Sequence, residues 1–555
     1  MRPIDWAVMF GWIALLVGWG MYRGRGSNTV NQFLLAGKTM PWYAMGLSIM
    51  ATQASAITFI STTALGYSDG MRFVQFYFGL PIAMVILCAT AVPIFHRAKV
   101  YTAYEYLESR FDAKTRALVT AIFLISRGLQ CGVALAAPAI TLSIVLGWPF
   151  QLTVAIMGGL MILYTTSGGI KAVTWADVPQ MFVILAALIA ALITAIRLLP
   201  PDVSFLDAVH LAGAAGKINI VTTHFDWNDR YNLFSGLIGG SFLFLAYFGT
   251  DQSQVQRYLT GKSVGQSRLS LLLNAMAKVP MQAMILFIGA MVFVFFLFVK
   301  PPIIFHPAEA QRVEQSDQYA GIAATYDQAF TDRRAAAIDL KNHQPGALER
   351  FRAAESRLDA ARTQATTLGN EKDTNYIFLS FVTHYLPAGV VGLALAVIFT
   401  AAMSASSGEI NSLATVSVVD IYRRHIHRDA SDRHYLFASR TATVFWGLFA
   451  ICFASFARSF GALIETVNVV GSLFYGTMLG VFVLAFFVKR VNGTAAFAGV
   501  IAGQIAIFAV AWLTNIAWLW YNAVGCLVAI AVAWAISLMT NSRSAIPGDS
   551  LPDPA

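Results

Sequence analysis

The sequence predicts an all-α integral membrane protein. Of its 555 residues, 57% are hydrophobic and only 12% are charged, and the mean hydropathy is +0.63. A water-soluble fold does not bury that much apolar surface. The apolar residues form long continuous runs, which are typical of spanning helices, whereas a β-barrel shows short alternating strands. We therefore expect the lipid bilayer to surround most of the chain.

Windows of about 19 residues predict about thirteen spanning helices. The first, at 5–22, lacks the strongly basic start and the cleavage site of a signal peptide, so we expect it to be retained. The other twelve are expected at 41–66, 72–96, 117–146, 149–168, 177–198, 233–249, 269–298, 389–410, 438–456, 462–488, 494–513 and 518–539.

Basic residues cluster in alternate loops between these helices, for example at 97–114, 257–268 and 423–433. Such loops face the cytoplasm. An odd number of helices then places the N-terminus outside and the short tail 540–555 inside an inner or plasma membrane.

Charge and cysteine usage exclude other classes of protein. The net charge of +9 is explained by membrane orientation and does not indicate a nucleic-acid partner. The four cysteines lie in apolar runs without CxxC spacing, which favours packing over metal binding or disulfides. We infer no obligate protein partner.

The segment 301–374 interrupts the apolar pattern of a transporter domain that otherwise covers 1–555. It opens with Pro301 and Pro302 and continues with many Ala, Glu, Arg and Gln residues. This composition predicts a charged, helical insertion, which the topology places on the extracytoplasmic side. A solvated insertion is the favoured interpretation of its role.

Polar interruptions of spanning helices indicate binding sites, because unwound backbone in transporters lines a central cavity. The second helix is interrupted at 51–55, and the seventh contains three glycines within 235–241. The two lie five helices apart, as an inverted repeat of five helices requires. Packing of small and polar residues between helices is the alternative for each.

The ninth helix carries Ser404, Ser407 and Asn411 at helical spacing, so that their oxygens share one face. Oxygen ligands suit a hard cation, and a polar helix interface is the alternative.

Ionisable residues within spans are costly and are candidates for function. Asp177 lies near a predicted cytoplasmic end, where interface capping and ion binding are both open. We interpret Asp251 and Arg257 as loop or interface charges, and we expect Lys278 to extend toward the membrane surface. Two further candidates are Arg127 and Glu409.

Several segments together resemble the sodium:solute symporter family, and most of all its monocarboxylate, vitamin and proline-type carriers. The resemblance covers roughly 33–422 apart from the insertion, and the remainder more weakly. It is carried by the segments 33–37, 51–55, 101–107, 168–173 with Asp177, 251–258 and 410–422.

The resemblance implies a LeuT-like core of two inverted five-helix repeats after one extra N-terminal helix. It also implies a Na⁺ site formed by backbone carbonyls of Ala51, Ala54 and Ala401 and by the Ser404 hydroxyl. Ala405 departs from the family, because its methyl group cannot supply the usual fifth oxygen.

Some relatives have a second cation site, which maps here to Asp177, Ser404 and Ser407. Gly408 lacks the hydroxyl that some members carry, and Glu409 is an added carboxylate.

The solute site is expected between the two interrupted helices. Thr58 and Tyr77 stand where the family's galactose carriers have an amide and an acid, which argues against a sugar. The other expected solute-binding residues are Gln53, Ser55, Gly239 and Gly240.

The predicted function is alternating-access symport of a small organic solute with Na⁺, with no enzymatic activity and no organic cofactor. Proton coupling through Glu409, or uncoupled transport, is an alternative. A nutrient sensor would need a large cytoplasmic extension. A membrane enzyme would need an intramembrane cluster of catalytic side chains, whereas the histidines are scattered near loops.

Overall fold

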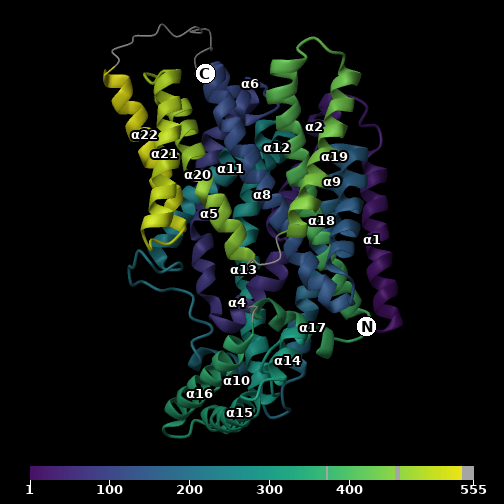
Figure 1. Cartoon of the computed structure of the whole chain (residues 1–555), viewed down its shortest axis with the longest axis vertical. Helices are drawn as coiled ribbons and strands as arrows, with labels where there is room; N and C mark the ends of the chain where they lie inside the picture. Colours follow the sequence, from purple (N-terminus) through teal and green to yellow (C-terminus); the bar gives the residue numbers. More distant parts are fainter. Residues whose placement is uncertain (370–372, 457–462, 540–555) are drawn as a thin grey trace.

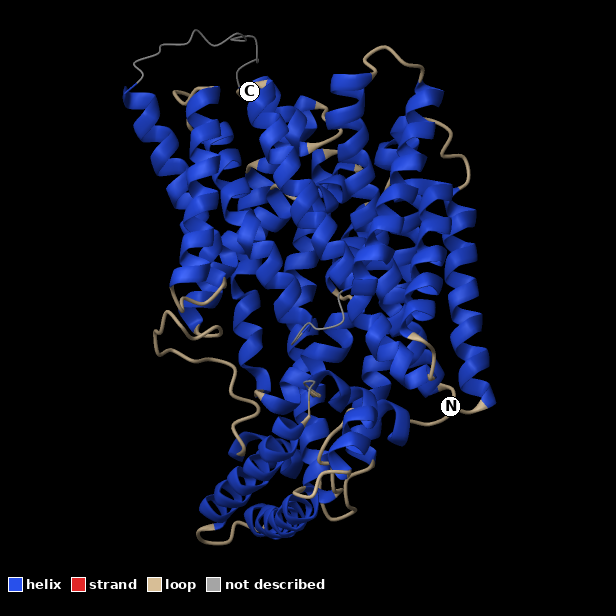
Figure 2. Ribbon diagram, in the orientation of Figure 1, coloured by secondary structure: helices blue, strands red, loops and turns tan. Residues whose placement is uncertain are grey.

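A computed structural model describes residues 1–369, 373–456 and 463–539 and shows a helical bundle from which a helical hairpin projects (Figures 1 and 2). Within these residues the β-structure is limited to one isolated bridge, between Met40 and Gly261. The predicted tail 540–555 lies outside the described residues. The all-α fold class is thus confirmed.

Ten helices of the described chain are long and apolar enough to span a membrane, and a bent pair brings the number to as many as eleven. The predicted count of about thirteen stays a prediction. The long helices are α1 (Pro3–Gly24), α8 (Ala113–Leu146), α9 (Phe150–Arg197), α13 (Val264–Phe298), α18 (Val390–Val416), α19 (Asp432–Phe456), α20 (Leu463–Phe487), α21 (Gly493–Leu513) and α22 (Leu519–Met539), together with the run of η3 (Gly70–Phe78), α5 (Gly79–Ala89) and α6 (Ala91–Ala98).

The second predicted span is broken, as its polar centre indicates. α3 (Trp42–Gln53) ends at Ala54, and the chain resumes as η2 (Thr58–Thr62) and α4 (Thr63–Ser68) at an angle of 65°. The Thr58 hydroxyl donates to the carbonyl of Gln53 at 2.8 Å, which satisfies one acceptor freed by the break.

The predicted interruption of the seventh span at 235–241 is wrong in position. Residues Ser235–Gly239 form a π-helical turn that continues into α11 (Gly240–Gly249). The break comes at Thr250 and Asp251, before α12 (Gln252–Leu259). The glycines serve close packing instead: a Cβ added at Gly236 would lie 2.0 Å from the carbonyl oxygen of Gln75.

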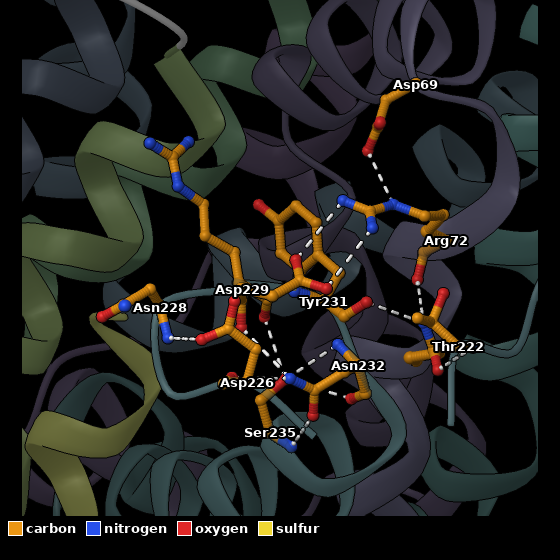
Figure 3. A network of polar contacts seen from close by, with 11 residues as sticks. Asp69, Arg72, Thr222, Asp226, Asn228, Asp229, Tyr231, Asn232 and Ser235 are labelled. Carbon is orange, nitrogen blue, oxygen red and sulfur yellow. Dashed lines mark hydrogen bonds and ion pairs between the residues drawn. The ribbon is translucent and has the colours of Figure 1, made fainter. Parts of the chain in front are cut away.

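A polar network fixes the start of this span against η3 (Figure 3). Arg72 reaches both carboxylate oxygens of Asp229 at 3.4 Å. Asn232 and Ser235 exchange hydrogen bonds between the side chain of each and the backbone N–H of the other, at 2.8 and 3.0 Å. The network holds the glycines of η4 (Ser235–Gly239) in contact with η3.

A further backbone break lies within α9, at Gly169. Gly169 has φ 56° and ψ −148°, and an added Cβ would lie 2.2 Å from the carbonyl oxygen of Phe33. Only glycine adopts this conformation readily in so narrow a space. The break falls between the predicted spans 149–168 and 177–198.

The insertion contains α14 (Pro307–Glu314), α15 (Tyr319–Lys341) and α16 (Ala347–Leu368). α15 and α16 pair around Tyr326, Phe330 and Leu358. The hairpin lies at the end of the bundle where α1 begins, and α22 ends at the opposite side (Figure 1). The remaining elements are α2 (Val30–Leu35), η1 (Ala36–Lys38), α7 (Ala103–Arg110), α10 (Phe205–Ala214), η5 (Thr374–Tyr376), α17 (Ile377–Tyr385) and η6 (Ser417–Ile426).

Candidate functional site

The end of α3, the resuming helix η2 and the inner faces of η3, α8, α11, α18 and α20 enclose a central cavity. Aromatic rings form one part of its wall, with polar and charged groups between them. The polar and aromatic lining residues are Thr52, Gln53, Ser55, Thr58, Phe76, Tyr77, Arg127, Gln130, Phe244, Tyr247, Glu409, Asn468 and Tyr475.

Four of the predicted solute-binding residues, Gln53, Ser55, Thr58 and Tyr77, line this cavity. The other two face neighbouring helices, because a Cβ at Gly239 would meet Leu519 at 3.1 Å and one at Gly240 would meet the carbonyl of Phe76 at 2.7 Å. Neither glycine is among the residues that line the described cavity.

Arg127 on α8 is the centre of a buried charge cluster at the cavity and is only 2% exposed. Its Nη1 donates to Glu409 Oε1 at 2.9 Å, and its Nη2 donates to Asp251 Oδ2 and to the Tyr475 hydroxyl. Tyr475 Oη lies 3.0 Å from Gln130 Oε1 and 3.1 Å from Asp251 Oδ2. A phenol has one proton, so Tyr475 donates to one of these two acceptors at a time.

The charges of the cluster do not balance, since one guanidinium faces two carboxylates. Glu409 Oε2 has no hydrogen-bond partner within the described residues, although the Cys131 thiol approaches this carboxylate. Arg127 Nε also has no hydrogen-bond partner there. Buried charges in such an environment interact strongly and are costly to leave unpaired.

Sequence reasoning selected Arg127 and Glu409 as charges within spans, but it did not connect them. Asp251 lies in the connection between α11 and α12, in agreement with the predicted loop, but it is not a surface charge: it is 1% exposed, and its Oδ1 caps α12 by accepting from Ser253 N at 2.9 Å. Tyr475 was missed, because a tyrosine in an apolar run carries no signal of its own.

The predicted Na⁺ ligands lie on two packed helices, Ala51 and Ala54 at the end of α3 and Ala401 and Ser404 on α18. The Ser404 hydroxyl donates its proton to Asp177 Oδ1. Its lone pairs then remain available to a cation. The methyl group of Ala405 lines the cavity next to this site.

Asp177 is fully buried between three donors. Ser48 and Ser404 donate to its two oxygens, and Arg257 Nη2 lies 3.7 Å from Oδ2. Ser407 instead donates to the carbonyl of Ser404 at 2.8 Å.

Two sequence interpretations are wrong because the side chains are buried. Arg257 is 1% exposed, and its guanidinium lies against Gly408, where an added Cβ would be 2.2 Å from Nη2. This contact explains the glycine. Lys278 does not reach the membrane surface: it is 0% exposed, with Nζ 5.5 Å from the centroid of the Tyr77 ring.

Comparison with known proteins supplies the family. A model of the sodium:solute symporter family matches residues 33–325 and 356–503. The human sodium-coupled monocarboxylate transporter 1 is 26% identical over 502 residues, 90% of this chain and 72% of the relative. The sodium/glucose cotransporter of Vibrio parahaemolyticus is 27% identical over 516 residues, 90% of this chain and 83% of the relative.

A solved structure described as the substrate-bound outward-open state of a Na⁺-coupled sialic acid symporter superposes with a TM-score of 0.78. It is 22% identical and covers 97% of this chain and 98% of its own. The likeness confirms a shared, LeuT-like fold.

Proposed function

The chain belongs to the sodium:solute symporter family, and from that premise we propose that it carries a small organic solute with a carboxylate group together with Na⁺. The single observation behind the carboxylate is Arg127, a guanidinium that lines the central cavity. Its planar array of donors matches a carboxylate, which it can bind through two parallel hydrogen bonds. The name of the monocarboxylate relative agrees with this class of solute.

The proposed Na⁺ site consists of the carbonyl oxygens of Ala51, Ala54 and Ala401 and the Ser404 hydroxyl. Support comes from the break after α3, because the last carbonyls of a helix lack intrahelical partners and carry partial negative charge. Ala405 leaves this site with one oxygen fewer than in many relatives, so Na⁺ binds weakly.

Asp177, Ser404 and Ser407 form a proposed second cation site. The Ser407 hydroxyl donates to the carbonyl of Ser404 at 2.8 Å, and its lone pairs remain available to a cation. Arg257 already places a positive charge 3.7 Å from Asp177. A second cation therefore binds less tightly than the first.

Alternating access follows from the arrangement of breaks. Solute and Na⁺ bind beside the α3 break, and the discontinuous helices move against the unbroken helices to open one side or the other. The protein is a multi-pass membrane protein. Its N-terminus and the insertion 301–374 lie outside, and its C-terminus lies inside. The start of α1 and the end of α22, which lie at opposite ends of the bundle in Figure 1, agree with this orientation.

Proton coupling is the second candidate. It is favoured by one observation, the buried Glu409 carboxylate that lines the cavity with one oxygen unbonded within the described chain. A carboxylate in this position can accept a proton as the solute enters.

Purified protein in liposomes tests the proposed function with matched pairs of an acid and its uncharged amide, such as lactate and lactamide. We expect an inward Na⁺ gradient to drive uptake of acids but not of amides. Equal uptake of acid and amide would contradict the role of Arg127. Uptake that follows a pH gradient and ignores Na⁺ would favour Glu409 as the coupling group.

A further inference from the structure

The Arg127 cluster joins one discontinuous helix to three continuous ones. Arg127, Glu409 and Tyr475 lie inside α8, α18 and α20, whereas Asp251 lies at the break between α11 and α12. Arg127, Glu409 and Tyr475 line the cavity, and Asp251 lies behind them, outside the described lining. The bond between Arg127 and Asp251 therefore holds the start of α12 to the unbroken part of the bundle.

α12 has other attachments. Gln254 Nε2 donates at 2.8 Å to the hydroxyl of Tyr247, which lines the cavity but lies on α11, the other half of the same discontinuous helix. Gln256 Nε2 donates to Asn411 Oδ1 at 2.8 Å, and Arg257 Nε donates to Ser48 Oγ at 3.1 Å. The acceptors Asn411 and Ser48 are buried and are absent from the described cavity lining. Among the cavity residues bonded to α12 or to its cap Asp251, Arg127 is the one whose positive charge attracts an anionic solute.

We propose that the solute carboxylate and Asp251 compete for Arg127, and that solute binding releases the start of α12. The inference rests on the proposed function, because it takes the solute to carry a carboxylate. Asp251 is an internal anion that occupies Arg127 until the solute arrives. Its displacement converts solute binding into movement of the half-helix beyond the break.

Electrostatics explains why a carboxylate must leave. Asp251, Glu409 and Arg127 together carry one net negative charge, and an anionic solute would bring the total to two. Like charges in a desolvated site repel strongly. A third carboxylate therefore binds well only when one internal carboxylate moves away from the guanidinium.

Geometry makes Asp251 the group whose departure moves a helix. The backbone of Glu409 lies in the middle of an unbroken, buried helix, so Glu409 can leave the guanidinium only by a rotation of its side chain, which would move no helix. Asp251 follows Thr250, which ends α11 with non-helical φ −130° and ψ −23°, so a change of two backbone dihedrals moves it. After release it keeps the Ser253 N–H as a partner, and the Tyr475 proton remains bonded to Gln130.

The test uses the full chain in liposomes with a reporter cysteine at Ser253, which is 1% exposed. The reporter Ser253→Cys is combined with Cys452→Ala, because Cys452 is the exposed cysteine of the described chain. Labelling by a membrane-permeant maleimide is measured with and without lactate, or another acid found by uptake, and Cys452→Ala alone gives the background. Lactate binding is measured separately by thermal shift.

We expect the acid to raise the labelling rate about tenfold, which corresponds to the loss of one charge-assisted hydrogen bond. Asp251→Asn should label at the high rate without solute and should bind the acid more tightly. The matched control is Glu409→Gln, which removes the other carboxylate from the same guanidinium but leaves the bond between Arg127 and Asp251: its labelling without solute should stay low, unlike that of Asp251→Asn. If Asp251→Asn does not fold, Arg127→Lys should raise labelling without solute, because an ammonium lacks the second pair of donors.

Three results separate the inference from the proposed function. Tight binding of an acid without any change in labelling would overturn the competition, while the proposed function would stand. Failure of every acid to bind would overturn the proposal that the solute carries a carboxylate, and with it the proposed competition for Arg127. Parental labelling of a folded Asp251→Asn protein would overturn the attachment of α12 whatever the solute is.

Discussion

Arg127 in the membrane bundle and Arg333 in the insertion are each at most 2% exposed, but their surroundings differ. Arg333 has one carboxylate, Glu355 at 3.0 Å, and one backbone acceptor, the carbonyl of Phe296 at 2.7 Å. Arg127 has two carboxylates and a phenol and lines a cavity. The charges around Arg333 balance, and this cluster attaches the hairpin to the end of α13. The Arg127 cluster has one excess negative charge and can exchange a carboxylate partner. Burial of an arginine alone therefore does not indicate a binding site.

The largest difference between the two clusters is expected from neutral substitutions. Arg127→Gln should abolish Na⁺-driven uptake, because it leaves two carboxylates buried without a cation and removes the proposed solute ligand. Arg333→Gln should lower stability by about 1.5 to 3 kcal/mol, the contribution of a hydrogen bond to a charged group, because Glu355 is partly exposed, and it should leave the KM for the solute unchanged. Uptake by liposomes and thermal unfolding of the same preparations measure both. A changed KM in Arg333→Gln would contradict the purely structural role of the Arg333 cluster.

The second-largest effect is expected at the proposed Na⁺ site, which lies beside the Arg127 cluster. Ala405→Ser adds a hydroxyl oxygen at the position where the methyl group now lines the cavity. One added ligand, treated as a hydrogen bond to a charged group, contributes about 1.5 to 3 kcal/mol, or roughly tenfold or more in apparent Na⁺ affinity. A Na⁺ titration of uptake that superimposes on that of the parent would contradict this site.

The two clusters also differ in how far sequence could predict them. The insertion follows from local composition, and Arg333 and Glu355 are 22 residues apart on neighbouring helices. The partners of Arg127 lie 124, 282 and 348 residues away in sequence. No local pattern connects residues so distant, so single charges could be selected but not their pairing.

The interrupted helices likewise include one break that the local sequence predicts and one that it does not. The polar run at 51–55 correctly indicated the break after α3, because hydroxyl and amide groups are unusual in a lipid-facing helix. Glycines at 235–241 gave the wrong position for the second break, because glycine serves close packing as well as unwinding. The true break at Asp251 is marked by a capping acid, which sequence reasoning took for an interface charge.

A smaller effect is expected from Glu409→Gln, which reduces the negative charge of the Arg127 cluster from one to zero. The acid should bind several-fold more tightly, since one repulsive charge is removed. Uptake should remain driven by Na⁺ and should not respond to a pH gradient. A pH-gradient dependence present in the parent and absent from Glu409→Gln would show proton coupling instead.

The smallest effect is expected in the insertion. Residues 326–355 lie outside the family match, and they contain Arg333 and Glu355. Replacing them with a short Gly-Ser linker should lower the melting temperature and change the KM by less than about twofold, because the cavity lining lies elsewhere. A large change of KM would assign the hairpin a part in transport.

Simultaneous measurement of ²²Na⁺ and solute influx into liposomes tests the central claim, that one cavity couples a carboxylate solute to Na⁺. We expect that the acid elicits ²²Na⁺ influx, that its amide does not, and that Arg127→Gln loses both fluxes together. Solute influx with no accompanying ²²Na⁺ influx, or acid-driven ²²Na⁺ influx that persists in Arg127→Gln, would contradict it.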